Sequence, residues 1–170
     1  GEHMIEIRPV PGRPLPESET PYLAGEFGAD VRTSGDCAVP RRSFYNMNLH
    51  LPSAARVSLS RRAASLRAGS WTEQGHPFYS GGATFRMELD LPDGFPGGFL
   101  VLPRVEAVAA ASLDGRGLGT RIWPPYEFPL PPGGGRRVVS VTVWNTLANM
   151  LEEYRAPGGL LERPFVRRGA

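Results

Sequence analysis

The side chains best suited to chemistry in this sequence are aromatic rings that have polar groups near them in the chain. An aromatic ring can cover the apolar face of a pyranose, while amide, carboxylate or guanidinium groups pair the sugar's hydroxyls. The rings are Trp71, Tyr79, Trp123, Tyr126 and Trp144, and the polar candidates are His76, Arg121, Glu127, Asn145 and Asn149. These residue types predict weak carbohydrate binding.

The same residues also have structural interpretations. Trp144 ends a predicted core strand, and Asn145 and Asn149 can satisfy backbone groups where the chain leaves that strand. Trp123 precedes Pro124-Pro125 and therefore lies in a rigid loop. Such a loop either presents a ring to a ligand or plugs one end of the core, and the sequence leaves both interpretations open.

Hydrolytic chemistry has weaker support. A glycosidase needs two carboxyl groups roughly 5 to 10 Å apart across a sugar, one of them with a raised pKa. Glu88 and Asp90 share one strand face at i, i+2, where a solvated outer face is the simpler interpretation, and Glu152-Glu153 lies in a polar stretch. A Ser-His-Asp triad would use His50 or His76, but the sequence has no Gly-x-Ser-x-Gly elbow. We expect a chain that is not itself an enzyme, without a deep pocket holding two carboxyls or a nucleophile beside a histidine.

Metal binding is similarly weakly supported. Cys37 is the single cysteine, so neither an internal disulfide nor a Cys-x-x-Cys metal pair exists, and we expect an inert thiol. Calcium prefers carboxylate and carbonyl oxygens, and Asp90 and Asp93 are the weak candidates for a structural calcium. No other cofactor is expected.

The glycine-rich run Leu-Asp-Gly-Arg-Gly-Leu-Gly at 113–119 could pass for a phosphate-binding loop. A phosphate loop must feed a helix whose N-terminal amides face the ligand. Here Pro124-Pro125 would stop a helix within about one turn, and neither the Gly-x-Gly-x-x-Gly nor the Gly-Lys-Ser/Thr pattern is present. Asp114-Gly115 instead supplies the positive φ values of a tight turn, so we predict a hairpin tip and no nucleotide site.

Charge and composition narrow the classes of partner. The chain has 19 basic and 17 acidic residues, a formal charge of +2, and every basic residue is an arginine. The arginine pairs are scattered instead of forming one stripe, which argues against nucleic acid. No apolar run approaches the ~20 residues of a membrane span, so no membrane partner is expected. Arginine in place of lysine, with abundant Ala, Gly and Pro, suggests a GC-rich coding sequence, while secreted and cytoplasmic localisation both stay open.

The chain is predicted to divide into four segments. They are a cloning scar at 1–4, a proline-rich linker or surface strap at 5–20, a β-sandwich module at 21–166 and a tail at 167–170. The 21 glycines and 18 prolines leave little room for long helices and favour short strands. We expect strands at 22–27, 44–51, 56–60, 83–91, 98–102, 104–113, 121–122, 126–130 and 137–144. Their spacing is typical of a sandwich or barrel.

Two runs carry a clear two-residue period. In 83–91, apolar residues alternate with polar ones, which predicts one buried and one solvated face. In 137–144, Val139, Val141 and Val143 share one face, and the mixed opposite face predicts partial cover. The alanine-rich run at 105–113 fits either helix or strand by propensity, but Pro103 before it and the Asp-Gly turn after it favour a strand.

Several short motifs, in this order, resemble a known family of modules. They are Phe-Tyr-Ser-Gly-Gly-Ala-Thr-Phe at 78–85, Val-Ala-Ala-Ala-Ser-Leu-Asp-Gly-Arg-Gly-Leu-Gly at 108–119, Trp-Pro-Pro-Tyr at 123–126 and Val-Thr-Val-Trp-Asn-Thr-Leu-Ala-Asn at 141–149. The order is similar to the galactose-binding-like jelly roll carried by glycoside hydrolases such as family 2 β-galactosidase-type enzymes and α-L-rhamnosidases. Asp114 stands where these modules usually have Asn, and Phe85 where they have Tyr; both changes suit the same fold. Two upstream segments, Leu-Ala-Gly-Glu-Phe at 23–27 and Trp-Thr-Glu-Gln-Gly-His-Pro-Phe-Tyr at 71–79, also resemble parts of such modules. The segment at 158–165 is similar to the strand with which these modules end.

The resemblance implies an all-β jelly-roll β-sandwich from the C-terminal region of a larger enzyme. It implies an upstream catalytic domain of the same parent chain as a partner and weak carbohydrate binding or domain scaffolding as the role. Fold analogy alone does not give a site. The alternatives are a stand-alone small carbohydrate-active hydrolase and a protein-interaction module without sugar binding. Sugar binding predicts Trp123 and Tyr126 exposed beside a concave polar patch, whereas scaffolding predicts them buried or on a flat apolar surface.

Overall fold

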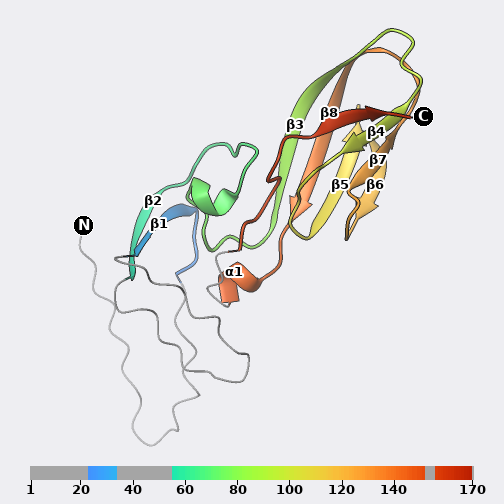
Figure 1. The fold of residues 1–170 in the computed structure, drawn as a ribbon. Helices are drawn as coiled ribbons and strands as arrows, with labels where there is room; N and C mark the ends of the chain where they lie inside the picture. The colour runs from blue at the N-terminus through green and yellow to red at the C-terminus, as the bar shows by residue number, and fades with distance from the viewer. Residues whose placement is uncertain (1–22, 34–54, 152–155, 170) are drawn as a thin grey trace, which may run out of the picture.

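A computed structural model describes residues 23–33, 55–151 and 156–169, which form a nearly all-β structure (Figure 1). The strands are β1 (Phe27–Thr33), β2 (Ala55–Arg61), β3 (Gly82–Leu91), β4 (Gly98–Val101), β5 (Val108–Leu113), β6 (Arg116–Arg121), β7 (Glu127–Leu130), β8 (Gly135–Trp144) and β9 (Phe165–Arg168). In these ranges, helical structure is confined to a 3₁₀ turn, η1 (Trp71–Gln74), and a short helix, α1 (Ala148–Leu151). The predicted all-β class is confirmed. Neither helical segment has the length and apolar character needed to cross a membrane.

The strands pair into antiparallel sheets. A four-stranded sheet has the order β3-β8-β5-β6, and a three-stranded sheet has the order β7-β4-β9. β1 and β2 form a separate two-stranded antiparallel sheet, in which the Ala29 N–H donates to the carbonyl of Gly75 at 2.8 Å. Strands far apart in sequence therefore lie side by side, as β3 and β8 do in Figure 1.

The hydrophobic core fills the space between the two larger sheets. Alternate residues of β5 and β8 point inward, as the two-residue period predicts, and Val139, Val141 and Val143 are fully buried. The facing sheet contributes Leu100 and Phe128, which are also fully buried. The predicted inward face of the 137–144 run is therefore confirmed, and the intermediate burial of most residues on its other face fits the partial cover expected there.

The apolar face of β3 is less buried than its sequence pattern predicts. Ala83, Phe85, Met87 and Leu89 are all half-buried, while Leu91 at the end of the strand is buried. β3 is the outer strand of a four-stranded sheet, and the opposite sheet has only three strands in the described ranges. The predicted alternation of buried and exposed residues is correct, but the position of β3 at the edge of its sheet leaves its inward face only partly covered.

The glycine-rich run forms a hairpin, not a phosphate loop. Asp114 and Gly115 have φ values of +48° and +81°, so this Asp-Gly pair makes the predicted turn between β5 and β6. β6 then occupies the glycine-rich stretch itself, whereas the sequence predicted a strand only at 121–122. β5 begins at Val108 instead of residue 104, because Ala107 has a φ of +72°, which breaks the extended conformation.

Other boundaries also shift. The predicted strand at 22–27 is replaced by β1, which begins at Phe27 and pairs with β2. The last strand, β9, runs to Arg168, two residues past the predicted end of the module, and pairs with β4. The predicted strand at 44–51, the proposed strap at 5–20, Cys37, His50 and Glu152-Glu153 lie outside the described residues.

Candidate functional site

Three predicted site residues come together near the start of β3. The rings of Trp71 and Tyr79 meet edge to face, with centroids 5.5 Å apart, and His76 meets Tyr79 with a centroid distance of 6.1 Å. η1 positions this cluster, because Ser70 caps its first turn by accepting a hydrogen bond from the Thr72 N–H at 3.3 Å. The 71–79 segment therefore folds into one aromatic cluster, as its composition allows.

Trp71 is the buried residue against which this cluster packs, and almost none of its side chain is accessible to a ligand. Its side chain is 1% exposed, and its buried indole Nε1–H has no hydrogen-bond partner in the described residues. The backbone at Gly158 and Gly159 crosses the indole so closely that a Cβ at either position would collide with it. The Trp71 N–H also donates to the Gly158 carbonyl at 3.0 Å. Trp71 thus ties the 70–79 segment to the chain that leads into β9.

The polar atoms around Tyr79 are occupied within the protein. The Tyr79 hydroxyl donates to the Gly82 carbonyl at 2.8 Å. Asn145 bridges two segments, since its amide donates to the Tyr79 carbonyl at 2.8 Å and accepts from the Gly81 N–H at 2.9 Å. Burial, with a smaller contribution from the charge of Arg62, lowers the pKa of His76 and so favours the neutral form of the ring. Asn145 therefore has the structural role that the sequence left open.

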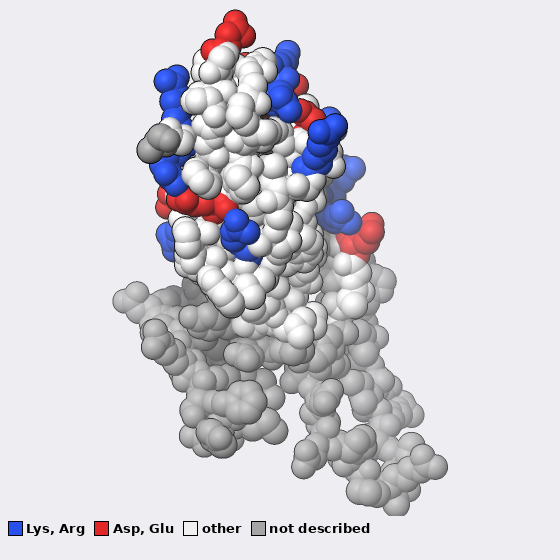
Figure 2. Space-filling model, turned by 90° about the vertical axis from the view of Figure 1, so that its right-hand side faces the viewer, with Lys and Arg blue, Asp and Glu red and all other residues white. Residues whose placement is uncertain are grey.

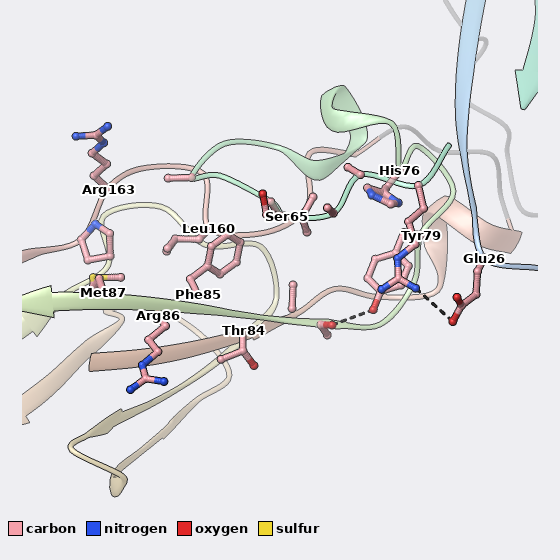
Figure 3. A pocket seen from close by; sticks show the side chains of 18 of the residues that line it. Glu26, Ser65, His76, Tyr79, Thr84, Phe85, Arg86, Met87, Leu160 and Arg163 are labelled. Atoms are coloured by element: carbon pink, nitrogen blue, oxygen red, sulfur yellow. Dashed lines mark hydrogen bonds and ion pairs between the residues drawn. The ribbon is translucent and has the colours of Figure 1, made fainter. Parts of the chain in front are cut away.

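A groove with a volume of about 960 Å³ runs along β3 (Figure 3). Phe85, Met87 and Leu160 line one side, Thr84 and Arg86 project on the other side of the strand, and the 25–27 and 62–68 segments complete the wall. His76 and Tyr79 lie at the end near the start of β3. The groove therefore wraps the edge of β3 that has no strand partner in the described residues, instead of forming an enclosed pocket.

The groove contains two carboxylates, but they lack the features of a hydrolytic pair. Glu26 lies 3.3 Å from the guanidinium of Arg62, and Glu88 forms an ion pair with Arg136. The two carboxylate side chains are 88% and 57% exposed. A glycosidase uses burial to keep its acid protonated, and neither carboxylate has that environment.

The second group of predicted residues lies at the end of β6 and is separate from the groove. Trp123 is 69% exposed and its neighbour Ile122 is 57% exposed, so this loop presents both apolar side chains to solvent. Tyr126 is buried, and its hydroxyl donates to the Ala107 carbonyl at 2.6 Å. The two rings that the sugar-binding interpretation needed side by side therefore have different environments.

The remaining predicted polar partners also make internal contacts. Arg167 donates to Glu127 at 2.6 Å, and Arg121 lies 5.4 Å from the ring centroid of the core residue Phe128. Asn149 is 3% exposed and forms two hydrogen bonds with the backbone of Ala156, at 2.9 and 3.0 Å. The structure does not gather these groups around Trp123.

The surface around Trp123 belongs to an apolar end of the four-stranded sheet. The last residues of β6 and β8 both pair with the first residues of β5, so the chain leaves both strands at the same end of the sheet. The large apolar side chains exposed at the end of β8 and on the segments that follow β6 and β8, which we call the apolar end, are Ile122, Trp123, Trp144, Leu147 and Met150. On the face shown in Figure 2, charged side chains gather in the upper part and on the flanks, and the lower part of the described surface is mostly uncharged.

Most residues of the apolar end are not of the types that the sequence marks as site candidates. Ile122, Leu147 and Met150 were not among the predicted site residues, because a single aliphatic residue near a strand end is most often buried. The usable signal was Ile-Trp-Pro-Pro at 122–125, in which two apolar residues precede a rigid proline pair.

The calcium prediction gains no support from the geometry. Asp90 and Asp93 are both exposed, and within the described ranges no group of three His, Cys, Asp or Glu residues lies close enough to hold a metal ion.

The hairpin tip between β5 and β6 is stabilised by a carboxylate. Asp114 accepts hydrogen bonds from the Val138 N–H at 2.8 Å and from Arg137 Nε at 2.5 Å. These contacts lower the pKa of Asp114, with the backbone hydrogen bond as the largest cause and the Arg137 hydrogen bond next.

An Asp114→Asn variant should therefore be less stable than the wild type at pH 7, with a difference that shrinks in acid. The pKa of Asp114 in the folded protein lies below the unfolded value of about 3.9. The carboxylate's contribution is complete above that unfolded value and is lost as the pH falls through the folded value. Urea midpoints of both proteins at pH 7 and at several lower pH values measure the effect, with Asp93→Asn as the control for an exposed carboxylate. A loss of stability in the Asp114→Asn variant that does not change with pH would contradict this assignment.

Comparison with known proteins gives only distant structural likeness. No family model and no curated protein matches the chain. A GH2 β-galacturonidase from Eisenbergiella tayi, solved bound to glycerol, is similar over 66% of this chain and 20% of its own, with 19% identity and a TM-score of 0.45. A rhamnosidase from Novosphingobium sp. PP1Y is similar over 88% of this chain and 16% of its own, with 19% identity and a TM-score of 0.47. This chain spans a fifth or less of the length of either protein, and neither likeness is close enough to assign a family.

Proposed function

We propose that this chain is a non-catalytic β-sandwich module, of the galactose-binding-like jelly-roll type, in a larger bacterial glycoside hydrolase. Its role is to dock against a neighbouring domain of that enzyme through the apolar end. The sequence motifs support the type of module, since four short motifs occur in the order typical of such domains. The antiparallel sheets packed around one core are compatible with that type.

The observation that carries the docking role is the exposure of Ile122 and Trp123. Both side chains are more than half exposed on one loop, at an end of the sheet where Leu147 is also 56% exposed. Clustered exposed apolar side chains are typical of interaction surfaces, because water contact with each of them is unfavourable. Burying them against a second domain removes that cost.

Weak sugar binding is the second candidate function, because the 69% exposed Trp123 could stack on a pyranose. Stacking gives little specificity without polar groups beside the ring. The predicted polar partners at Glu127, Asn145 and Asn149 already make hydrogen bonds inside the protein. We therefore place docking ahead of sugar binding.

Ligand-observed NMR distinguishes the two roles. The purified chain is mixed with galactose, rhamnose, glucuronate, xylose and arabinose, and saturation transfer to each sugar is recorded. The docking role predicts no transfer to any of them. Transfer to one sugar that disappears in a folded Trp123→Ala variant would establish a binding module and overturn the docking proposal. Transfer that survives the substitution would point to the β3 groove as a sugar site and would also overturn it.

A further inference from the structure

The outer edge of β3 is a long strand edge without a backbone partner in the described residues. β3 has ten residues and pairs along its whole length with β8 on one side only. Its other edge faces the groove, whose lining includes side chains from both faces of the strand. The backbone donors and acceptors on such an edge can pair with another strand.

β3 lacks three of the features that protect an edge from pairing, although it carries charged side chains at Arg86, Glu88 and Asp90. Proteins commonly shield edge strands with proline, a β-bulge, short length or charged side chains. β3 contains no proline, and its register with β8 is continuous from Gly82 to Leu91, without a bulge. Phe85, Met87 and Leu89 pack against the core but are only half-buried, so an added strand would cover apolar surface as well as backbone.

We propose that two copies of this chain pair through their β3 strands, antiparallel, about a two-fold axis at Met87. This is a function of the β3 edge, distinct from the docking role of the apolar end. In this register each position lies opposite its mirror position, so that the interface is the same patch on both copies. The four-stranded sheets of the two copies then form one continuous sheet.

The side chains of β3 are self-complementary in this register. On the polar face, Arg86 lies opposite Glu88 of the second copy, and Glu88 lies opposite its Arg86. On the apolar face, Met87 meets Met87, and Phe85 meets Leu89. Opposite charges and apolar side chains directly across an antiparallel pair are both stabilising. Glu88 can accept a hydrogen bond from Arg86 of the second copy while it keeps its ion pair with Arg136 of its own chain, because a carboxylate has two oxygens.

The nearest alternative registers are disfavoured. A shift that keeps the same faces together moves the pairing by two positions. In one direction it places Glu88 opposite Glu88, although Arg86 then lies opposite Asp90, and in the other it places Arg86 opposite Arg86. Of these three registers, only the Met87-centred one has no like-charged pair directly across it. Like charges directly across a strand pair are destabilising. A shift by a single position would place polar side chains on the apolar face, so the Met87-centred register is the one that the sequence of β3 favours.

The oligomeric state and a set of charge variants test this proposal. Light scattering coupled to size exclusion should give the wild-type chain twice its 18.5 kDa mass. Arg86→Glu and Glu88→Arg should each be monomeric alone, because each places two like-charged pairs across the axis. A mixture of the two variants should return to the dimer mass, since both carboxylates of one copy then lie directly opposite the two guanidinium groups of the other. Arg116→Glu, on β6 at the opposite edge of the sheet, is the matched control and should stay dimeric.

A cross-link test does not depend on the charge variants being folded. In a Cys37→Ser background, Met87→Cys places two thiols across the two-fold axis, where antiparallel strand neighbours are within disulfide range. Oxidised glutathione should convert this variant to a covalent dimer, while Arg116→Cys in the same background should form no covalent dimer, because β6 lies at the opposite edge of the sheet. A wild-type chain that is monomeric at every concentration, charge variants that stay dimeric, a mixture that stays monomeric, or equal cross-linking of both cysteine variants would each overturn the proposal.

Discussion

Replacement of Trp71 by alanine is expected to lower the free energy of unfolding by about 3–5 kcal/mol. The indole is the largest fully buried side chain in the described residues, and Gly158, Gly159 and Tyr79 pack against it. Alanine would leave a cavity at the point where the 70–79 segment meets the chain leading to β9. Both the apolar transfer energy and the lost packing contribute to the effect.

Urea unfolding followed by far-ultraviolet circular dichroism measures this loss without relying on tryptophan fluorescence. Trp71→Phe is the matched control. It keeps an aromatic ring and removes an N–H that has no partner in the described residues, so it should cost clearly less than alanine. A Trp71→Ala protein within about 1 kcal/mol of the wild type would contradict the structural role of this residue.

The second large effect is expected at the apolar end, and it concerns association and not stability. Under the docking proposal, we expect an Ile122→Ser, Trp123→Ala double variant to bind the rest of the proposed parent enzyme at least about 30-fold more weakly than the wild type does. Central tryptophans in interfaces commonly contribute about 2 kcal/mol or more, which corresponds to that factor. Isothermal titration calorimetry between this chain and the separately produced remainder of the parent measures it.

The stability of the double variant should change by no more than about 0.5 kcal/mol, because both side chains are exposed in the isolated chain. Leu59→Ser is the matched control, since Leu59 is 58% exposed but lies on β2 instead of at the apolar end. Equal weakening by the control variant would indicate a nonspecific loss of apolar surface and would contradict a localised interface.

The parts of the fold set by local chemistry could be predicted from sequence. Asp114-Gly115 makes the predicted turn because few other dipeptides adopt two successive positive φ values. The inward valines of β8 follow directly from the two-residue period of a strand. The alanine-rich run is a strand despite its helix propensity, since pairing with β6 and β8 outweighs that preference.

Features that depend on tertiary position could not be predicted. The half-burial of Phe85 and Met87 follows from the place of β3 at a sheet edge, which the alternation of residues cannot report. The glycines of β6 are typical of a loop, but neighbouring β5 supplies a backbone partner that turns them into a strand. The predicted strand at 22–27 begins earlier in the sequence than β1 does. The extent of β1 is set by its pairing with β2, which is distant in sequence.

The residue types of the candidate site are read from the sequence, but the environment of each side chain is not. The aromatic and amide side chains lie on the 71–79 segment and near the ends of β6 and β8. Their roles depend on partners distant in sequence, such as the Gly81 N–H for Asn145 and the Ala107 carbonyl for Tyr126. Only exposure separates a ring that packs, as Trp71 does, from a ring that is presented to solvent, as Trp123 is.

The central claim, that the apolar end is a docking surface, is tested most directly by hydrogen–deuterium exchange. Exchange is compared between this chain alone and the same residues inside the intact parent polypeptide. We predict slower exchange in the proposed parent at Ile122 and Trp123 and along 145–151, with little change in the two-stranded sheet of β1 and β2. Unchanged exchange at the apolar end, with new protection elsewhere on the module, would contradict the account.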